Sequence, residues 1–336
     1  MKTKDFRKPF IRSGLSVIFM ASFFIFISCG LYDSPDDEKT QKIKVMNWNL
    51  QTFFDAEFDG NEYTDFKTKK SGWNQKKYEE RLDRLASVIK TLDADVVVME
   101  ELEKEAQLQD IANRLSGTFE LSKTYHYAFF SGDSGSSIGC AVLSRFPIDE
   151  ITAHTMDIRL EEKQPAMRAI TQFTLNLNEQ SLVVFVNHWK SKSGGAEESE
   201  IWRKRQEALL ANLIFKARKE NKAVLAAGDF NRNISEFDYK ASEDGKTNII
   251  LHGKQDVEVY SPWFMENGTY MIPGSYWYKD EWERIDHFFA CGPVEIRDFA
   301  AETGEWADGE GQPLRYQVWN GKGYSDHLPI TCTVRF

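Results

Sequence analysis

Polar residues follow apolar runs at several places in this 336-residue chain, and their types suit a metal-dependent reaction. In AVLAAGDFNRN (223–233), five small or aliphatic residues lead into Gly228, Asp229 and Asn231. Similar positions are occupied by Asn47, Asn49, Glu100, Glu101, His188, Asp286, Asp326 and His327. Carboxylates buried close together are costly unless a cation neutralises them. Oxygen ligands without a Cys or His cluster favour Mg²⁺, Mn²⁺ or Ca²⁺ over zinc, so we predict a divalent-metal site at these strand ends.

Spacing suggests roles for four of these side chains. Asp229 and Asn231 are two residues apart on an extended segment, so both face the same side, and Gly228 lets the chain turn there. A histidine beside a carboxylate has a raised pKa and a favoured tautomer. His327, next to Asp326, therefore suits general base catalysis.

Each of these residues also has a structural interpretation when it is taken alone. An Asp at a strand end often caps a turn, and a single His is often packed in the core. We expect a structural role for His287, because it follows Asp286 directly and faces the other way in a strand. Cys140, Cys291 and Cys332 lie in or beside apolar runs and are expected to be buried small hydrophobes, although one pair could form a disulfide.

The elements that must position these residues alternate short strands with a few long helices. Apolar residues at spacings of three and four from Tyr78 to Leu92 predict an amphipathic helix. Further helices are expected over 103–115 and 197–219, and the polar, irregular segment 234–273 is expected to be a functional loop. Strands are expected over 43–54, 95–103, 125–130, 138–148, 169–177, 181–189, 223–230, 284–291 and 329–336. The pattern predicts one α/β (α+β) domain with a mixed sheet, or two packed sheets, and helices outside.

The first 42 residues are expected to lie outside this domain. A basic head precedes an apolar run of 14 residues, which is too short to span a membrane, since that needs roughly 20. The run ends in FISC and resembles a bacterial lipoprotein signal in which Cys29 becomes lipidated, although Phe26 stands where Leu is usual. Ordinary secretion is the alternative. We therefore expect a signal peptide over 1–29, an acidic tether over 30–42 and the domain over 43–336.

Charge bears on the partners of this domain. The whole chain carries a net charge of −10, the signal contributes +4, and the remainder is therefore near −14. This acidity weighs against a broad nucleic-acid-binding face but leaves room for a local one. We expect a monomer outside the cytoplasm, held on a membrane through a lipid on Cys29 (outer membrane, cell surface or periplasm). The sequence indicates no protein partner.

Six motifs occur in a characteristic order: MNWNLQTFFD, DVVVMEELE, VNHWKSK, AAGDFNRN, ERIDHFFA and YSDHLPI. Their content and order resemble the endonuclease/exonuclease/phosphatase superfamily, which includes deoxyribonuclease I and secreted bacterial relatives. The resemblance covers residues 43–336. It implies a DNase I-like two-sheet β-sandwich flanked by helices, with a metal-dependent site at one edge.

The resemblance also implies roles for the motif residues. The metal-binding set is Asn49, Glu101 and Asp326, and the catalytic set is His188, Asp229, Asn231, Asp286, Asp326 and His327. In these roles His188 acts at the phosphate, Asp229 orients the attacking water and Asn231 holds a phosphate oxygen. Asp286 supports the first histidine or a metal, and Asp326 orients and charges His327. Glu100 stands where members usually have Gln.

Three basic residues are the expected contacts to the substrate. Lys190 follows the first catalytic histidine closely, and Arg145 and Arg168 are either phosphate contacts or structural ion pairs. The resulting prediction is a Mg²⁺-dependent (or Mn²⁺- or Ca²⁺-dependent) phosphodiesterase, a nuclease acting on DNA. The alternative is a phospholipid or inositol phosphate phosphohydrolase, for which the aromatic segment 261–278 would supply a membrane contact. A non-catalytic binding module would have lost site residues, and all the expected acids and histidines are present.

Overall fold

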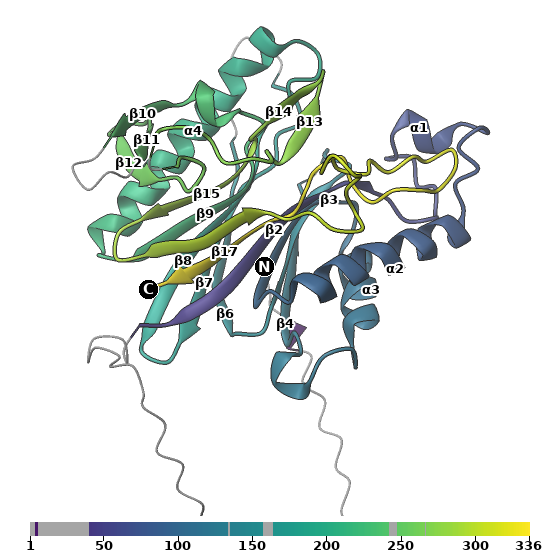
Figure 1. Ribbon diagram of the computed structural model, residues 1–336, viewed down its shortest axis with the longest axis horizontal. Helices are drawn as coiled ribbons and strands as arrows, with labels where there is room; N and C mark the ends of the chain where they lie inside the picture. The colour runs from purple at the N-terminus through teal and green to yellow at the C-terminus, as the bar shows by residue number, and fades with distance from the viewer. Residues whose placement is uncertain (1–3, 6–39, 134, 157–163, 242–246, 266) are drawn as a thin grey trace, which may run out of the picture.

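The computed structural model describes residues 4–5, 40–133, 135–156, 164–241, 247–265 and 267–336. Cys29 and nearly all of the predicted signal peptide and tether therefore lie outside the described residues. Two large sheets pack face to face, with α2 and α3 outside one and α4 outside the other (Figure 1). The predicted two-sheet α/β sandwich is confirmed.

The two sheets are built from strands distant in sequence. The first has the order β1 (Lys4–Asp5), β4 (Tyr127–Ser131), β5 (Gly139–Ser144), β3 (Val96–Leu102), β2 (Lys42–Phe53), β17 (Ile330–Arg335), β16 (Glu295–Ala301). The second has the order β10 (Asp238–Ala241), β11 (Thr247–Leu251), β12 (Val257–Tyr260), β15 (Asp286–Cys291), β9 (Ala223–Asp229), β8 (Gln180–His188), β7 (Ile170–Leu177), β6 (Ile148–His154). A separate hairpin joins β13 (Tyr276–Tyr278) and β14 (Glu281–Glu283).

The helices cover the outer faces of the sandwich. They are α1 (Thr64–Lys67), α2 (Gln75–Leu92), α3 (Glu105–Leu115) and α4 (Ala196–Lys219), with 3₁₀ turns at Leu121–Lys123 and Ile234–Glu236. Helix α2 begins at Asn74, whose side chain accepts a hydrogen bond from Lys77 N (3.2 Å), and ends at Asp93 in the left-handed conformation. Its buried stripe runs from Tyr78 to Leu92, as the spacing predicted.

Alternation along the strands divides the apolar residues between two cores. On β2, Val45 packs between the sheets, whereas Met46 and Trp48 pack beneath α2 and α3. On β3, Val98 and Met99 divide in the same way. Because successive side chains in a strand face opposite sides, one sheet serves both cores.

Each sheet contains a parallel pair linked by a helix, and these pairs place the site. Strands β2 and β3 are parallel and joined through α2, and β8 and β9 are parallel and joined through α4. The carboxyl ends of both pairs lie at the same edge of the sandwich, where β2 approaches β9. This is the edge at which ligands commonly bind in such sheets.

Two predicted elements were wrong in detail. The segment 138–148 is not one strand, because β5 ends at Ser144 and β6 begins at Ile148 in the other sheet. The Ser144 side chain bonds Phe146 in a turn, and Pro147 has no N–H for a ladder. The predicted loop 234–273 contains a meander of β10, β11 and β12. Strand β10 is exposed throughout, so no apolar run marked it.

No helix in the described ranges is long and apolar enough to cross a membrane. The three cysteines of the domain are free, with Cys140 and Cys332 buried and Cys291 partly buried. They are the small buried residues that the sequence indicated.

Candidate active site

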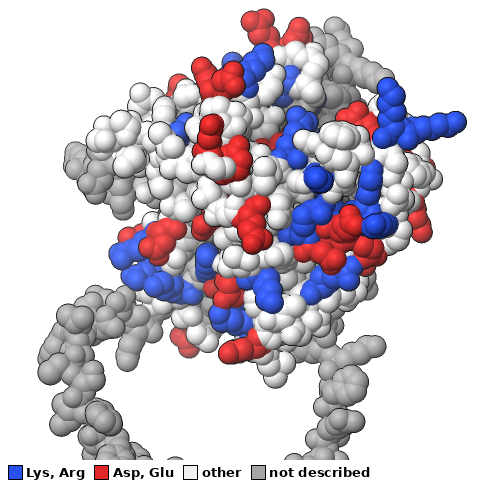
Figure 2. Space-filling view, turned by 45° about the vertical axis from the view of Figure 1, so that its right-hand side comes forward, with Lys and Arg blue, Asp and Glu red and all other residues white. Residues whose placement is uncertain are grey.

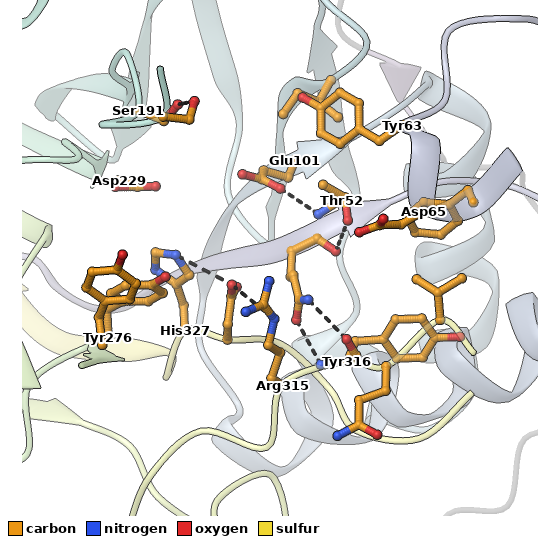
Figure 3. A pocket seen from close by; sticks show the side chains of 18 of the residues that line it. Thr52, Tyr63, Asp65, Glu101, Ser191, Asp229, Tyr276, Arg315, Tyr316 and His327 are labelled. Atoms are coloured by element: carbon orange, nitrogen blue, oxygen red, sulfur yellow. Dashed lines mark hydrogen bonds and ion pairs between the residues drawn. The ribbon is translucent and has the colours of Figure 1, made fainter. Parts of the chain in front are cut away.

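A pocket of about 920 Å³ opens at the shared edge of the two sheets. Seven residues of the predicted site line it: Glu101, Arg168, His188, Asp229, Asn231, Asp326 and His327. Glu101, Asp229 and His327 project into it from three distant parts of the chain (Figure 3). Asn49 and Asp286 lie directly behind these residues and bond them.

Glu101 reaches the pocket because the end of β3 is irregular. Its φ is +68°, in the left-handed region that non-glycine residues rarely adopt, and the pairing register shifts beside it. Its Oε2 accepts a hydrogen bond from Thr52 N (2.5 Å), and Asn49 Nδ2 lies 3.3 Å from its Oε1. Burial and the nearby Asp326 carboxylate raise the pKa of Glu101. A carboxylate held in this way binds a cation readily.

Asp229 is the centre of an amide network that joins the two sheets. Its Oδ2 accepts hydrogen bonds from Asn49 Nδ2 and Asn231 Nδ2, both at 3.0 Å. Its Oδ1 accepts one from Asn231 N at 2.7 Å. Burial, followed by the neighbouring Asp286, raises the pKa of Asp229 to about 7. Gly228, at φ +143°, allows this arrangement, because a Cβ there would lie 1.9 Å from Asn187 O.

His327 forms its hydrogen bond with Asp286, whereas Asp326, the partner that the sequence suggested, makes a longer ion pair with it. His327 Nδ1 lies 2.8 Å from Asp286 Oδ2, while its Nε2 is 3.9 Å from Asp326 Oδ1. Burial by itself lowers the pKa of His327, but Asp286 outweighs burial and the pKa lies well above its usual value. Tyr276 packs against the imidazole with ring centroids 4.8 Å apart. His327 is therefore a buried imidazolium whose ring orientation is fixed by Asp286.

The loop that carries His327 is bonded to β2. Trp48 Nε1 donates to His327 O (2.9 Å), and the Ser325 hydroxyl donates to Asn49 O (2.6 Å). Asn49, in the first motif, thereby contacts Ser325 in the last motif. Strand β2 and the motif YSDHLPI are therefore bonded together as one rigid unit.

His188 has the opposite electrostatic character to His327. Burial, with a contribution from Arg168, lowers the pKa of His188 well below its usual value. Its Nε2 is 3.6 Å from Glu101 Oε1 and 3.9 Å from Asp229 Oδ2. Arg168 donates to the carbonyl oxygens of His188 (3.2 Å) and Trp189 (2.7 Å), so it fixes the end of β8. His188 is a neutral imidazole between two acids.

The donor set fits a hard divalent cation. The site gathers Glu100, Glu101, Asp229, Asp286 and Asp326. Glu100 is fully buried and its pKa is raised well above the usual value, so it adds little charge. The positive charges of His327 and Arg168 do not balance the other four acids when these are ionised, and burial raises the pKa of Glu101 and Asp229. A divalent cation would relieve this excess of negative charge, and the ligands that face it would be oxygen atoms.

A separate group of acids lies where the loop after β2 meets the end of β3. Asp59, Glu62 and Glu103 have carboxylate oxygens within 4.8 Å of one another. Lys104 Nζ lies 2.9 Å from Asp59 Oδ2 and 2.9 Å from Asp55 Oδ2. The chain itself supplies a cation to this group.

Two of the predicted substrate contacts lie elsewhere. Arg145 does not line the pocket; it bonds Asp93 and Asp95 and stacks near Phe119 and Tyr125. Its side chain is 5% exposed, so it is a structural ion pair. Lys190 Nζ donates to Ser191 O and Ser193 O, and it shapes the loop after β8 instead of facing the pocket.

His287 faces away from the site, as strand alternation predicted. Its Nε2 lies 2.9 Å from Arg232 O, and its ring packs against Phe230 and Phe289.

The outer wall of the pocket includes Lys192, from the motif VNHWKSK, and Tyr276 and Tyr278, from the aromatic segment 261–278. Sequence reasoning missed the rest of this wall: Tyr63, Lys70, Arg315 and Trp319. Several of these residues lie in loops without a motif, and a contact across distant loops leaves no periodic signal. The glycine-rich and aromatic stretch YQVWNGKGY, directly before the SDH motif, was the available clue.

The sequence profile of the Endonuclease/Exonuclease/phosphatase family matches residues 46–327. No curated protein sequence matches the chain. Among solved structures, TDP2 of D. rerio in complex with a single-stranded DNA product is similar at a TM-score of 0.55 and 19% identity, covering 87% of this chain and 98% of that one. A truncated TDP2 of Caenorhabditis elegans is similar at a TM-score of 0.54 and 16% identity, covering 87% and 97%.

A mannosyl-6-phosphatase of Bacteroides thetaiotaomicron is similar at a TM-score of 0.53 and 15% identity, covering 88% of this chain and 100% of that one. At these identities the structures show a shared fold. The profile match spans most of the chain and contains five of the six motifs and the YSDH part of the sixth. The chain therefore belongs to the endonuclease/exonuclease/phosphatase family, whose members are hydrolases that act on phosphoester bonds.

Proposed function

We propose that this protein is a divalent-metal-dependent phosphodiesterase, and more narrowly a nuclease that cleaves DNA outside the cytoplasm. The observation that carries the proposal is the convergence of Glu101, Asp229 and the Asp286–His327 pair on one pocket. These groups provide a cation ligand, an acceptor for a proton and a buried positive charge. Phosphodiester hydrolysis needs all three.

Glu101, with Asn49 and Asp326 beside it, would hold the cation. When bound, Mg²⁺ or a similar ion supplies Lewis-acid polarisation of a phosphoryl oxygen and offsets the charge that develops on it. Glu101 is suited to this, because Thr52 N fixes one of its oxygens while its side chain keeps 18% exposure to the pocket.

The remaining residues divide the proton chemistry between them. Asp229 has a pKa of about 7, which suits a general base that takes the proton from an attacking water near neutral pH. His327 uses Nδ1 to bond Asp286, which leaves its Nε2 proton to be donated to a phosphate oxygen. This division reverses the role of base that the sequence suggested for His327. Asn231 lines the pocket, and its Nδ2 donates to Asp229 Oδ2 and to Trp189 O, so it positions Asp229.

The surroundings of the pocket favour DNA over a phospholipid. Lys70, Arg168 and Lys192 line the pocket, and the similar TDP2 structure contains a single-stranded DNA product. A phospholipid enzyme was expected to present segment 261–278 as an exposed aromatic surface. Trp263 in that segment is fully buried in the core, and of its described large hydrophobic residues only Met265, Ile272 and Tyr278 are exposed, of which one is aromatic.

The face of the molecule in Figure 2 carries no broad, purely basic area among its described residues. Figure 2 shows Lys and Arg interspersed with Asp and Glu over one face of the molecule. This agrees with a binding surface confined to the pocket and its rim. The similar mannosyl-6-phosphatase structure makes a sugar phosphate the second candidate substrate.

The proposed location of the protein outside the cytoplasm rests on the sequence of residues 1–29. We infer a signal peptide over 1–29 and a lipid on Cys29, which would hold a monomeric enzyme on a membrane outside the cytoplasm. Palmitate labelling of the wild type and of Cys29→Ala would test the lipid.

The activity test offers purified protein four substrates: plasmid DNA, sphingomyelin, inositol phosphates and mannose 6-phosphate. Each is measured with Mg²⁺ and with EDTA. We expect nicking of DNA that needs Mg²⁺, is lost in Asp229→Ala and is kept in Asp256→Ala, a control on an exposed loop. Intact DNA beside a hydrolysed lipid or sugar phosphate would show that the nuclease assignment is wrong.

A further inference from the structure

A tryptophan on the pocket wall has no role in the chemistry described above. Trp319 lines the pocket, and 68% of its side chain is exposed. Of the tryptophans in the described ranges, Trp319 is the most exposed. A single exposed apolar residue is normal by itself, but this aromatic ring lines the pocket of the candidate active site, where it can contact a ligand.

The loop that carries Trp319 is held firmly from below by α2. Lys77 Nζ donates to Val318 O (2.9 Å) and to Trp319 O (3.1 Å). Arg84 donates to Gly321 O (2.6 Å) and Gly323 O (3.0 Å). Four backbone carbonyls are therefore fixed by two cationic side chains.

The near end of the loop is held by β2 as well. Tyr316 N donates to Gln51 Oε1 (2.8 Å), and Gln51 Nε2 donates to Tyr316 O (3.1 Å). The guanidinium of the buried Arg81 lies 3.9 Å from the Tyr316 ring centroid. The indole of Trp319 thus stands on a preorganised support, which lowers the entropy lost when a ligand stacks on it.

A cation on the same loop lies close to the reacting centre. Arg315 Nε is 3.8 Å from Asp326 Oδ2, and Asp326 neighbours His327. Figure 3 shows the Arg315 side chain extending toward the centre of the pocket. Its side chain is 68% exposed, so its guanidinium can bind an anion from the ligand. Arg315 and Trp319, four residues apart in sequence, thus line the same pocket as the catalytic residues.

We propose that Trp319 is a stacking platform for an unpaired nucleobase and that Arg315 binds the phosphate linking this nucleotide to the scissile one. The substrate class is then single-stranded nucleic acid with at least one nucleotide beyond the scissile phosphate. The proposal rests on the nuclease function proposed above. A base in a duplex is already stacked on its neighbours, so only an unpaired or splayed base can cover the indole. A hexose phosphate has one phosphate group and leaves Arg315 without an anion.

The test compares kcat/KM of the full chain in detergent on a single-stranded 12-mer, its duplex and bis(4-nitrophenyl) phosphate. We expect Trp319→Ala to lose roughly 5- to 150-fold on the single strand, the range for one base–aromatic stack. Its loss on the other two substrates should be much smaller, and Trp319→Phe should restore most of the single-strand rate. Tyr239→Ala, an exposed aromatic residue outside the pocket, is the matched control and should behave as wild type.

The outcomes separate this inference from the function on which it rests. Wild-type cleavage of DNA with equal losses of Trp319→Ala on all three substrates would indicate a structural role and overturn the platform alone. An unchanged rate of Trp319→Ala on the single strand would overturn it as well. If the wild type hydrolyses bis(4-nitrophenyl) phosphate but no DNA, the nuclease function and the platform both fail. Melting temperatures of the variants confirm that each is folded.

Discussion

Replacing Glu100 with glutamine should stabilise the metal-free protein, and the gain should grow with pH. Glu100 lies on the inner face of β3 and is fully buried. Neither of its carboxylate oxygens has a hydrogen-bond partner within the described part of the chain. Burial, followed by the charges of Asp286 and Asp229, raises its pKa well above the usual value. Glutamine keeps the size of the side chain and removes the ionisable group.

The sign and size of the effect follow from proton binding. An unfolded Glu titrates near 4.3, whereas folded Glu100 keeps its proton to a higher pH. Between these two pKa values the native state binds more protons, so the free energy of unfolding falls as pH rises, by about 1.4 kcal/mol per pH unit. From pH 5 to pH 7 the ceiling is about 2.7 kcal/mol, or roughly 5 °C in Tm. Glu100→Gln removes this loss.

Thermal unfolding in EDTA at pH 5 and pH 7 measures the effect. Glu100→Gln should melt close to the wild type at pH 5 and several degrees above it at pH 7. Glu57→Gln, at an exposed position, is the control and should show no such difference. An equal shift at both pH values, or a less stable variant at pH 7, would mean that Glu100 is charged and well solvated, and would refute the reasoning.

Two further predictions concern the His327 pair and the displaced arginine. Asp286→Asn should lower kcat roughly 10- to 150-fold, the value of a charge-assisted hydrogen bond. It should also move the alkaline limb of the pH–rate profile to lower pH, because the pKa of His327 falls. An unchanged alkaline limb would contradict the pairing of His327 with Asp286. Arg145→Ala should lower the free energy of unfolding by about 1–3 kcal/mol in urea titrations, since it removes a buried guanidinium that bonds two acids, while kcat stays the same. Asp93 keeps Lys123 and Asp95 keeps Lys44 N as partners. Lost activity at unchanged stability would return Arg145 to substrate binding.

Much of the fold was predictable because local patterns determine it. The stripe from Tyr78 to Leu92 fixes one face of α2, and apolar alternation fixes the strands that carry Asn49, Glu101 and Asp229. Strand β10 was not predictable, since an exposed edge strand shows no apolar period. Strands β11 and β12 are short but bury alternate residues, a signal that the prediction of a loop overlooked.

The site was predictable in composition and less so in its pairings. The sequence suggested Asp326 as the partner of His327, because the two residues are adjacent. A sequence alone does not show which distant residues come into contact. The structure brings Asp286, 41 residues earlier, to Nδ1 of that histidine. The same limit applies to Arg145, whose acid partners lie 52 and 50 residues away.

The sequence by itself therefore determined which residue types gather at one edge: apolar periodicity defines the strands, and polar residues end them. Tertiary structure decided which of two adjacent acids enters the pocket, through the positive φ of Glu101, and left Glu100 buried without a partner. It also decided that Arg315 and Trp319 form the outer wall. The physical reason is that hydrophobic patterning is a local property of the chain. Hydrogen bonds, charge partners and pocket walls depend on how distant strands and loops meet.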